Sequence, residues 1–336
     1  MKKAIVFAQA VFVAAFVACG GNGEPDPYPM DDEIRLNQIQ VKGTHNSYKV
    51  ATDYCAPEWC LTMPPLYEQL DLHGARTVEL DVHYNADGTL DVYHLAVFDS
   101  LSTCGKFTEC LGQVKTWSDD NPGHLPIMVM VEPKDEYDDE ALKFKNRLNV
   151  IDDEILSVFD RSEIVTPDDV RGDHATLREA IETEGWPTLR KCRDKVMFMM
   201  LDSGDHRTAY LALHPNLEGA TIFTRNGEGE SWSPILEMSE ATTPEREAAL
   251  LAAVQANYLV RTTIDEPRTT VAVFEPVAEA TLRTGAQIIN TDHPTENTVP
   301  EQEGGPFRFD IPEGNPARCN PINAPEGCTP EILENL

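Results

Sequence analysis

Polar side chains with the chemistry of a metal or acid–base site occur where short apolar runs end. His45 and Asn46 follow the run "QIQVKG", and Glu79 and Asp81 lie two residues apart in "VELDV". Alternate side chains of an extended chain project from the same face, so the two carboxylates point in the same direction. They repel each other unless a cation or a basic group lies between them. The spacing therefore indicates either a metal site or a paired acid–base site.

A solvated edge strand, with both acids facing water, is the structural alternative for this pair. The flanking Val78, Leu80 and Val82 argue against it, because they form an apolar face that needs burial. We therefore favour a functional interpretation of the two acids.

His94 is a third candidate, and a predicted turn brings it near the acids. The dipeptide Asp87-Gly88 is a strong signal for a two-residue hairpin turn, since type I′ geometry needs positive φ at both central residues. Counting outward from this turn places Asp81 opposite His94. A core histidine that donates to a backbone carbonyl is the alternative.

Glu132 and Lys134 repeat the two-residue spacing at the end of the run "PIMVMV". One acid and one base then share a face of the strand. A structural ion pair at the point where the strand reaches the surface explains them equally well. The sequence has no His-x-His or His-Glu-x-x-His pattern, which argues against zinc. Hard oxygen ligands favour calcium or magnesium.

Apolar runs of strand length alternate with longer helical patterns, such as 139–159 and 269–285, which is typical of a parallel α/β sheet. Continuous apolar runs favour strands buried on both faces. We therefore predict a TIM-type (β/α)8 barrel, regular or irregular, in which polar residues at the strand ends meet at one mouth. The eight expected strands are 37–43, 76–82, 90–95, 126–132, 195–201, 219–225, 257–263 and 286–292.

The N-terminal residues have the layout of an export signal, with two lysines before a short apolar segment. The segment 16–20 resembles a bacterial lipobox, which would acylate Cys19 and anchor the exported protein at the cell envelope. Ordinary cleavage with free secretion is the alternative. We expect a signal peptide over 1–18, a flexible acidic linker over 19–33, the barrel over 34–296 and an irregular C-terminal wrap over 297–336.

Acidic residues outnumber basic residues 57 to 27, which gives a net charge of −30. This charge repels nucleic acid and excludes it as a partner. It also repels an anionic membrane, so a lipid substrate needs a metal, a local basic patch or a tether. We expect a monomer, although no sequence feature fixes the oligomeric state.

Six of the seven cysteines beyond Cys19 occur as close pairs, and export favours disulfides. Cys192 is left over, and we expect it to be a buried free thiol. The expected disulfides are Cys55–Cys60, Cys104–Cys110 and Cys319–Cys328.

Taken together, the motifs resemble the calcium-dependent phosphoinositide-specific phospholipases C, and in particular their secreted bacterial branch. The similarity extends from about residue 36 to residue 328, over "THNSY", "QLDLHGARTVELDV", "YHL", "PIMVMVEPKD", "NYLVRT", "GAQIINTD" and "ARCNPINAPEGC" in this order. The resemblance implies a TIM-type barrel that binds one Ca2+ and cleaves phosphatidylinositol-type lipids.

The resemblance also implies roles for individual residues. His45 and His94 would be the catalytic histidines, and a metal-bound carboxylate such as Glu79 would take the proton of the inositol 2-hydroxyl. The implied products are diacylglycerol and a cyclic inositol phosphate that water can later open. The implied calcium ligands are Asn46, Glu79, Asp81 and Glu132.

Lys134 and Arg261 are candidate contacts for the charged headgroup, chosen by position alone. Headgroup phosphorylation preference is left open by the sequence. The related alternative is a glycerophosphodiester phosphodiesterase, but Asn46 stands where that family has an arginine. A calcium-binding surface lipoprotein without activity is the alternative from another class, and the presence of both histidines argues against it.

Overall fold

The structure is a computed structural model, and it describes residues 26–56, 59–136, 138–145, 147–299, 305–312 and 316–334. The predicted signal peptide and Cys19 lie outside the described residues. Within the described ranges, none of the helices combines the length and apolar character that a membrane span requires.

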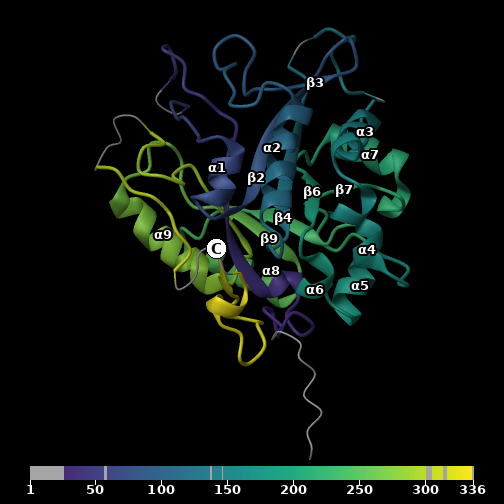
Figure 1. The fold of residues 1–336 in the computed structure, drawn as a ribbon, viewed down its shortest axis with the longest axis vertical. Helices are drawn as coiled ribbons and strands as arrows, with labels where there is room; N and C mark the ends of the chain where they lie inside the picture. The colour runs from purple at the N-terminus through teal and green to yellow at the C-terminus, as the bar shows by residue number, and fades with distance from the viewer. Residues whose placement is uncertain are drawn as a thin grey trace, which may run out of the picture.

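Eight parallel strands form a barrel, as predicted (Figure 1). Every neighbouring pair shares a backbone ladder except β7 and β8, which the single bridge between Arg225 and Ile235 joins. The two-residue strand β5 (Ile164–Val165) pairs with the start of β6 outside this ring. In order around the barrel, the strands are β1 (Ile39–Thr44), β2 (Ala75–Tyr84), β4 (Ile127–Lys134), β6 (Val196–Met200), β7 (Ile222–Phe223), β8 (Ile235–Met238), β9 (Leu259–Thr263) and β10 (Ile288–Thr291).

One of the eight predicted strands is wrong. Residues 90–95 do not form a barrel strand, because β3 (Leu90–Val92) is the antiparallel hairpin partner of β2. The missing barrel strand is β8, a four-residue segment that carries the polar Glu237 in its centre. A strand this short, with only three apolar residues, leaves too weak a periodic signal to recognise.

The α-helices lie around the outside of the barrel, with α9 on one flank and α4 and α5 on the other in Figure 1. The predicted helix over 269–285 agrees with α9, but the one over 139–159 is too long, because only its second half forms α3. The helices are α1 (Leu66–Asp71), α2 (Phe107–Asp120), α3 (Asn149–Val158), α4 (Pro167–Arg171), α5 (Leu177–Thr183), α6 (Leu189–Cys192), α7 (Asp205–Leu213), α8 (Pro244–Gln255) and α9 (Val271–Thr284). Short 3-10 helices lie at Leu36–Gln38, Arg161–Glu163, Pro215–Leu217 and Pro330–Ile332.

The apolar strands form the core of the molecule. All side chains of β6 are buried, and so is the run Ile127–Val131 of β4, as the continuous apolar runs predict. Helix α2 packs on this core through one face, because its buried residues recur at helical spacing. Those residues are Phe107, Cys110, Leu111, Val114 and Trp117.

The end of the chain closes the barrel at the start of its strands. Strand β11 (Ala317–Cys319) pairs antiparallel with β1. Further on, the carboxylate of Glu334 accepts hydrogen bonds from the buried guanidinium of Arg76 and from the backbone N–H of Leu125. The described part of the predicted C-terminal wrap is therefore bound to the barrel, while its boundary at residue 297 stays a prediction.

Residues 26–33 differ from the expected flexible linker, because they are attached to α6 and the loop after it. Asp26 pairs with Arg190, and the buried Asp31 pairs with Arg193. The ring of Tyr28 stacks on the guanidinium of Arg193. These two arginines give an acidic segment specific partners that its composition does not reveal.

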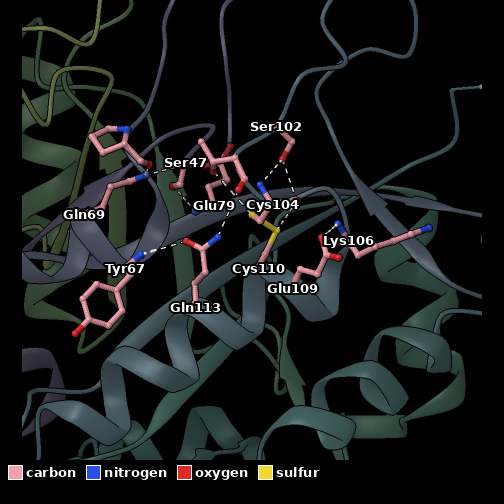
Figure 2. The surroundings of a disulfide bond; sticks show 12 residues. Ser47, Tyr67, Gln69, Glu79, Ser102, Cys104, Lys106, Glu109, Cys110 and Gln113 are labelled. Carbon is pink, nitrogen blue, oxygen red and sulfur yellow. Dashed lines mark hydrogen bonds between the residues drawn. A yellow bond between two sulfur atoms is a disulfide. The ribbon is translucent and has the colours of Figure 1, made fainter.

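The three predicted disulfides are present, and Cys192 is free and buried. Figure 2 shows Cys104–Cys110, which joins the loop after β3 to the first turn of α2. Beside it, the backbone N–H of Lys106 donates to the carboxylate of Glu109 and so caps the helix. The disulfide Cys104–Cys110 thus anchors the end of the loop that carries His94.

Candidate active site

The polar residues at the carboxyl ends of β1, β2, β4 and β10 converge at one mouth of the barrel, as expected for this fold. Beside them lies a pocket of about 260 Å³. Its lining residues are His45, Asn46, Lys49, Trp59, Leu61, His94, Glu266, Pro267 and Asp292.

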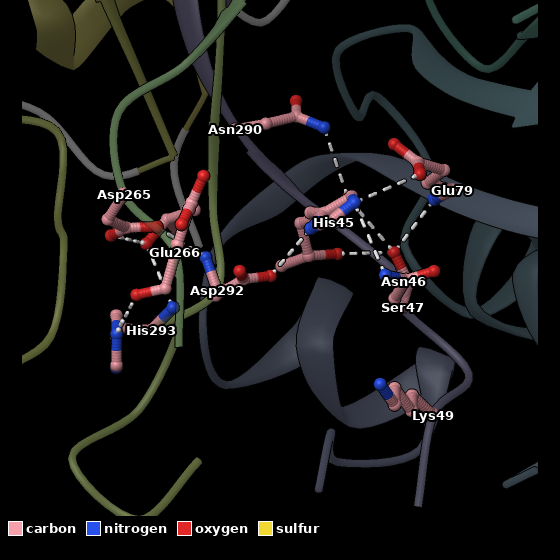
Figure 3. Close-up of polar contacts among 12 residues, drawn as sticks. His45, Asn46, Ser47, Lys49, Glu79, Asp265, Glu266, Asn290, Asp292 and His293 are labelled. Atoms are coloured by element: carbon pink, nitrogen blue, oxygen red, sulfur yellow. Dashed lines mark hydrogen bonds and ion pairs between the residues drawn. The ribbon is translucent and has the colours of Figure 1, made fainter. Parts of the chain in front are cut away.

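The turn after β1 is attached directly to β2. Asn46 has a φ of 48°, in the left-handed region that asparagine tolerates better than most residues. Ser47 donates its N–H to the carbonyl of Glu79 at 3.0 Å, and its Oγ accepts the N–H of Glu79 at 2.7 Å. Gln69 of α1 donates to the carbonyl of Ser47 at 2.6 Å. The turn therefore holds His45 and Asn46 in fixed positions beside Glu79 (Figure 3).

The imidazole of His45 is held by Asp292, which directly follows β10. The Nδ1 atom of His45 lies 2.8 Å from Oδ1 of Asp292, and its Nε2 lies 3.6 Å from a carboxylate oxygen of Glu79. Burial disfavours the charged ring, but the charges of Asp292 and Glu79 outweigh it and raise the pKa of His45 to about 9. His45 therefore carries a positive charge at neutral pH in this arrangement.

Three of the four predicted calcium ligands form a cluster. Oxygens of Glu79, Asp81 and Glu132 lie within 4.8 Å of one another. The parallel register of β2 and β4 sets Asp81 opposite Glu132. Burial, reinforced by Glu132 and Glu79 against the opposing charge of Lys134, raises the pKa of Asp81 to about 8.

The cluster fits a hard divalent cation. Both carboxylate oxygens of Asp81 are buried and accept no hydrogen bond within the described part of the chain. The ammonium of Lys134 lies 3.4 Å from one of them and 2.7 Å from Glu132. Arg261 and His45 pair with Glu79, so Lys134 is the one cation that pairs with Asp81 and Glu132 among the described residues. The buried oxygens of Asp81 can therefore still serve as ligands for a divalent cation.

Asn46, the fourth predicted ligand, lies beside the cluster without belonging to the group of three carboxylates. Its Oδ1 accepts a hydrogen bond from the hydroxyl of Tyr48 at 3.2 Å, and its Nδ2 lies 3.2 Å from Nε2 of His45. The charges of Asp81 and Glu79 act on the buried Tyr48, whose pKa burial raises well above its ordinary value. The role of Asn46 as a calcium ligand stays a prediction.

Arg261, predicted as a headgroup contact, is buried beneath the cluster. Its guanidinium donates to Glu79 and to Glu237 of β8, and Arg225 pairs with the same Glu237. Only 3% of Arg261 is exposed. Its guanidinium, which was expected to face the headgroup, is paired with these two carboxylates. The structure thus places Arg261 in contact with Glu79, a predicted calcium ligand, and the contact of Arg261 with substrate stays a prediction.

His94 lines the same pocket as His45, but not for the predicted reason. In the β2–β3 hairpin Val82 pairs with Val92, which shifts the register by one residue from the one that sets Asp81 opposite His94. The turn is longer than two residues, because the N–H of Asn85 donates to the carbonyl of Thr89. His94 lies beyond the strand, where its Nδ1 is 2.7 Å from Oδ2 of Asp99.

Sequence reasoning assigned no role to the two carboxylates that hold the histidines. Asp292 lies in "NTDHP", one of the strand ends that indicated the site, so its position gave a usable signal. Asp99 lies in the loop after His94 and gave none, because only the closed loop brings it back to the imidazole. Both acids are buried, and each contacts Nδ1 of one histidine.

A family model described as "Phosphoinositide phospholipase C, Ca2+-dependent" matches residues 87–321. This chain belongs to that family. It is therefore a phosphoinositide phospholipase C, an enzyme that cleaves a phosphodiester of phosphatidylinositol with Ca2+ as its cofactor. No sequence among curated proteins matches the chain.

Solved structures agree with the fold of this phospholipase C. A calcium-dependent phosphoinositol-specific phospholipase C from Pseudomonas sp. is 18% identical with a TM-score of 0.58, covering 85% of this chain and 100% of its own. One from Streptomyces antibioticus is 21% identical with a TM-score of 0.58, covering 77% and 95%. The phosphatidylinositol-specific enzyme of Staphylococcus aureus is 14% identical with a TM-score of 0.53, covering 91% and 95%. At these identities the likeness shows a shared fold.

Proposed function

We propose that this phospholipase C cleaves its lipid by attack of the inositol 2-hydroxyl on phosphorus, which releases diacylglycerol and a cyclic inositol phosphate. The observation that carries the proposal is the pair of histidines lining one pocket, each with Nδ1 held by a buried carboxylate. That contact leaves Nε2 of each ring to act on the substrate.

Glu79, Asp81 and Glu132 would hold the calcium ion, with Asn46 as a further ligand from the adjoining turn. The short separation of the three carboxylates supports this assignment, and so do the buried oxygens of Asp81, which accept no hydrogen bond within the described residues. A bound Ca2+ supplies positive charge that lowers the pKa of a nearby hydroxyl and stabilises phosphoryl oxygens.

Glu79 accepts the proton of the attacking 2-hydroxyl, since it is the carboxylate nearest to the Nε2 of His45 and borders the same site. The guanidinium of Arg261 keeps Glu79 in place. His45 donates a hydrogen bond to a nonbridging phosphate oxygen, and its positive charge stabilises the negative charge that develops there. Asp292 supports that charge from the other side of the ring.

His94 donates a proton to the departing diacylglycerol oxygen. An alkoxide is a poor leaving group, so this donation removes a large part of the barrier. Asp99 orients the ring from Nδ1, and the edge of Trp59 packs against it with ring centres 5.9 Å apart. The two histidines thus act at different oxygens of the same phosphate.

Exposed apolar side chains around the pocket support a membrane lipid as the substrate, rather than a soluble glycerophosphoinositol. They lie in the segment that leads into and includes the loop closed by Cys55–Cys60, and on the loop after His94. The hydroxyl of Thr52 donates to the carbonyl of Phe98 and so links the first segment to the second loop. In a chain of net charge −30, apolar contact is the favourable route to a lipid surface. These residues are Tyr54 (93% exposed), Trp59 (41%), Val97 (76%), Phe98 (72%) and Leu101 (50%).

We further propose that the protein is exported and anchored through an acylated Cys19, with free secretion as the alternative. The lipobox-like segment 16–20 supports the anchor. Labelling producing cells with a fatty acid, in the wild type and in Cys19→Ala, tests it. Label that depends on Cys19 supports the anchor, and an unlabelled, freely released wild-type protein rejects it.

One assay tests the proposed chemistry. The domain is incubated with phosphatidylinositol, its phosphorylated forms and glycerophosphoinositol, with and without a calcium chelator. Release of diacylglycerol and cyclic inositol phosphate from the lipid, abolished by the chelator, is the expected result. A His45→Ala protein that still binds calcium but has lost turnover supports the assigned roles. Unchanged activity of that variant rejects them, and turnover of glycerophosphoinositol alone rejects the lipid substrate.

A further inference from the structure

The carboxylate that holds His94 is shared with a buried lysine. Oδ2 of Asp99 lies 2.7 Å from Nδ1 of His94 and also 2.7 Å from Nζ of Lys49. Lys49 and Asp99 are each 1% exposed, whereas the side chain of His94 is 18% exposed and reaches the pocket. The ammonium of Lys49 is therefore separated from the imidazole of His94 by one carboxylate oxygen, at the wall of the pocket that both residues line.

The backbone holds these three groups in place. Lys49 forms an antiparallel bridge with Ser102, and the N–H of Thr103 donates to the carbonyl of Tyr48 at 2.7 Å. The N–H groups of His94 and of the next residue both donate to the carbonyl of Asp99, which closes the loop. The side chain of Lys49 is buried, so its ammonium reaches Asp99 from a backbone that these contacts hold in place.

The partner of His45 has an acidic neighbour, whereas the partner of His94 has a basic one. Behind Asp292, the partner of His45, lies the buried carboxyl of Asp265, whose Oδ1 accepts the N–H of Asp292 at 2.7 Å. No lysine or arginine pairs with Asp292 among the described residues. The His45–Asp292 pair therefore has the acid Asp265 as its neighbour, and the His94–Asp99 pair has the base Lys49 as its neighbour.

The charge of Lys49 changes the electrostatic effect that Asp99 has on His94. Burial opposes ionisation of Asp99, but hydrogen bonds from His94 and Lys49 and their charges outweigh it and keep the pKa of Asp99 below its usual range. An ionised carboxylate alone strengthens the hold of an imidazole on its proton. A second cation on the same oxygen offsets that field while leaving the orienting hydrogen bond intact.

We propose that Lys49 is a positioning residue for proton donation by His94: by sharing Asp99, it lets the carboxylate orient the ring without holding the proton that the ring must give away. This inference rests on the proposed role of His94 as the general acid. Enzymes commonly separate an acid from a neighbouring charged group by giving the two different surroundings. Here the difference is made by Lys49 behind one histidine and Asp265 behind the other.

Other charged groups face this part of the site from neighbouring elements. His83 of β2 feels the charge of His94, and burial lowers the pKa of His83 to about 4, so it is neutral at pH 7. Glu136 binds the N–H of Ala96 in the His94 loop, and Glu266 and Asp292 line the same pocket.

Three acids act on Lys49 itself. Burial lowers the pKa of Lys49, and the charges of Asp99, Asp292 and Asp81 oppose that effect. Only Asp99 forms an ion pair with Lys49 among the described residues.

The direct test is an NMR titration of the His94 imidazole in Lys49→Met, Lys49→Arg and wild type. We expect Lys49→Met to raise the pKa of His94 by about one unit or more, because a cation near the ring is lost. Lys49→Arg keeps the charge and should restore the wild-type value. The matched control is Lys106→Met, since Lys106 pairs with Asp91 in the same hairpin but not with the partner of a histidine. An unchanged His94 pKa in Lys49→Met overturns the proposal.

Kinetics separate this inference from the role of His94. A weaker acid slows release of the diacylglycerol alkoxide, so kcat of Lys49→Met on phosphatidylinositol should fall about tenfold, with its alkaline limb moved to higher pH. A 4-nitrophenyl ester of inositol phosphate needs no proton on its leaving group, so its turnover should be nearly unchanged. Equal losses on both substrates contradict the proposal. Equal losses in His94→Ala contradict the general-acid role itself.

Lys49→Met leaves the buried carboxylate of Asp99 without one of its two cations, which can prevent folding. A second pair of variants covers that case. Asp99→Asn and the double variant Lys49→Met/Asp99→Asn differ only in the lysine. The pKa of His94 should be about one unit lower in Asp99→Asn than in the double variant. Equal values overturn the proposal.

Discussion

Asp81 of β2 and Glu132 of β4 lie directly opposite each other in a parallel register, with the oxygens of both within 4.8 Å of an oxygen of Glu79. A cluster of this kind destabilises the metal-free protein, because burial and mutual repulsion oppose ionisation. We therefore expect a calcium ion bound by these carboxylates to relieve their repulsion.

Asp81→Asn should weaken calcium binding by at least about tenfold, since a carboxylate ligand is replaced by a neutral amide. The same change should leave the melting temperature in chelator unchanged or higher, because it removes repulsion. Calorimetric titration and melting with and without calcium measure both effects. Asp138→Asn, which alters a fully exposed acid, is the control and should change neither. Wild-type affinity in Asp81→Asn would show that the cluster is not the calcium site.

Asp292→Asn should lower kcat by about 10²-fold or more, because an amide cannot support the charge of His45. KM should change much less, since Asp292 supports the charge of the imidazole rather than supplying binding energy for the lipid. The control is Asp202→Asn, whose carboxylate lies 3.2 Å from Nδ1 of His206 and lines no part of the pocket. If both variants lose activity equally, the contact with His45 has no special role.

Arg76→Met should destabilise the protein by about 3–5 kcal/mol, because it leaves the buried carboxylate of Glu334 without its partner. The guanidinium also packs over the ring of Trp117, 4.4 Å from its centre. Urea unfolding measures the change, and Arg246→Met, at an exposed ion pair, should cost less than about 0.5 kcal/mol. Equal stability of the two variants would contradict the structural role of the C-terminal segment.

Cys192 should resist thiol reagents in the native protein. Burial raises the pKa of its thiol to about 12, so at pH 8 the thiolate is about a thousandfold scarcer than for an exposed cysteine. Reaction with a chromogenic disulfide should be slow at pH 8, should quicken as the pH rises, and should become fast in denaturant. Rapid labelling of Cys192 in the folded protein would show that the thiol is accessible.

The sequence predicted those parts of the site that depend on strand periodicity. Glu79, Asp81 and Glu132 sit on extended segments, where alternate side chains share a face, and the structure brings all three together. The continuous apolar runs likewise predicted the buried strands β4 and β6. Such patterns need only local geometry, which the sequence carries directly.

The features that the sequence did not predict depend on tertiary contacts or on exact turn length. One extra residue in the turn after Tyr84 shifts the hairpin register, and such a shift reverses the facing of every side chain. Asp99 reaches His94 only because its loop closes on itself. The short strand β8 is defined by its neighbours, and the sequence did not indicate that Arg261 pairs with Glu237 and Glu79 inside the barrel.

The weak contact between β7 and β8 bears on how calcium affects the stability of the barrel. A single backbone bridge closes the ring there, and a run of ion pairs leads from Arg225 through Glu237 and Arg261 to Glu79. Loosening the contact between β7 and β8 would displace Glu79, a predicted calcium ligand, and a cation bound by Glu79 would stabilise that contact. Opening of the contact and calcium binding would then be thermodynamically linked. We therefore expect bound calcium to stabilise the barrel as well as to assist the reaction, and amides beside Arg225 and Ile235 should exchange with solvent more slowly in its presence.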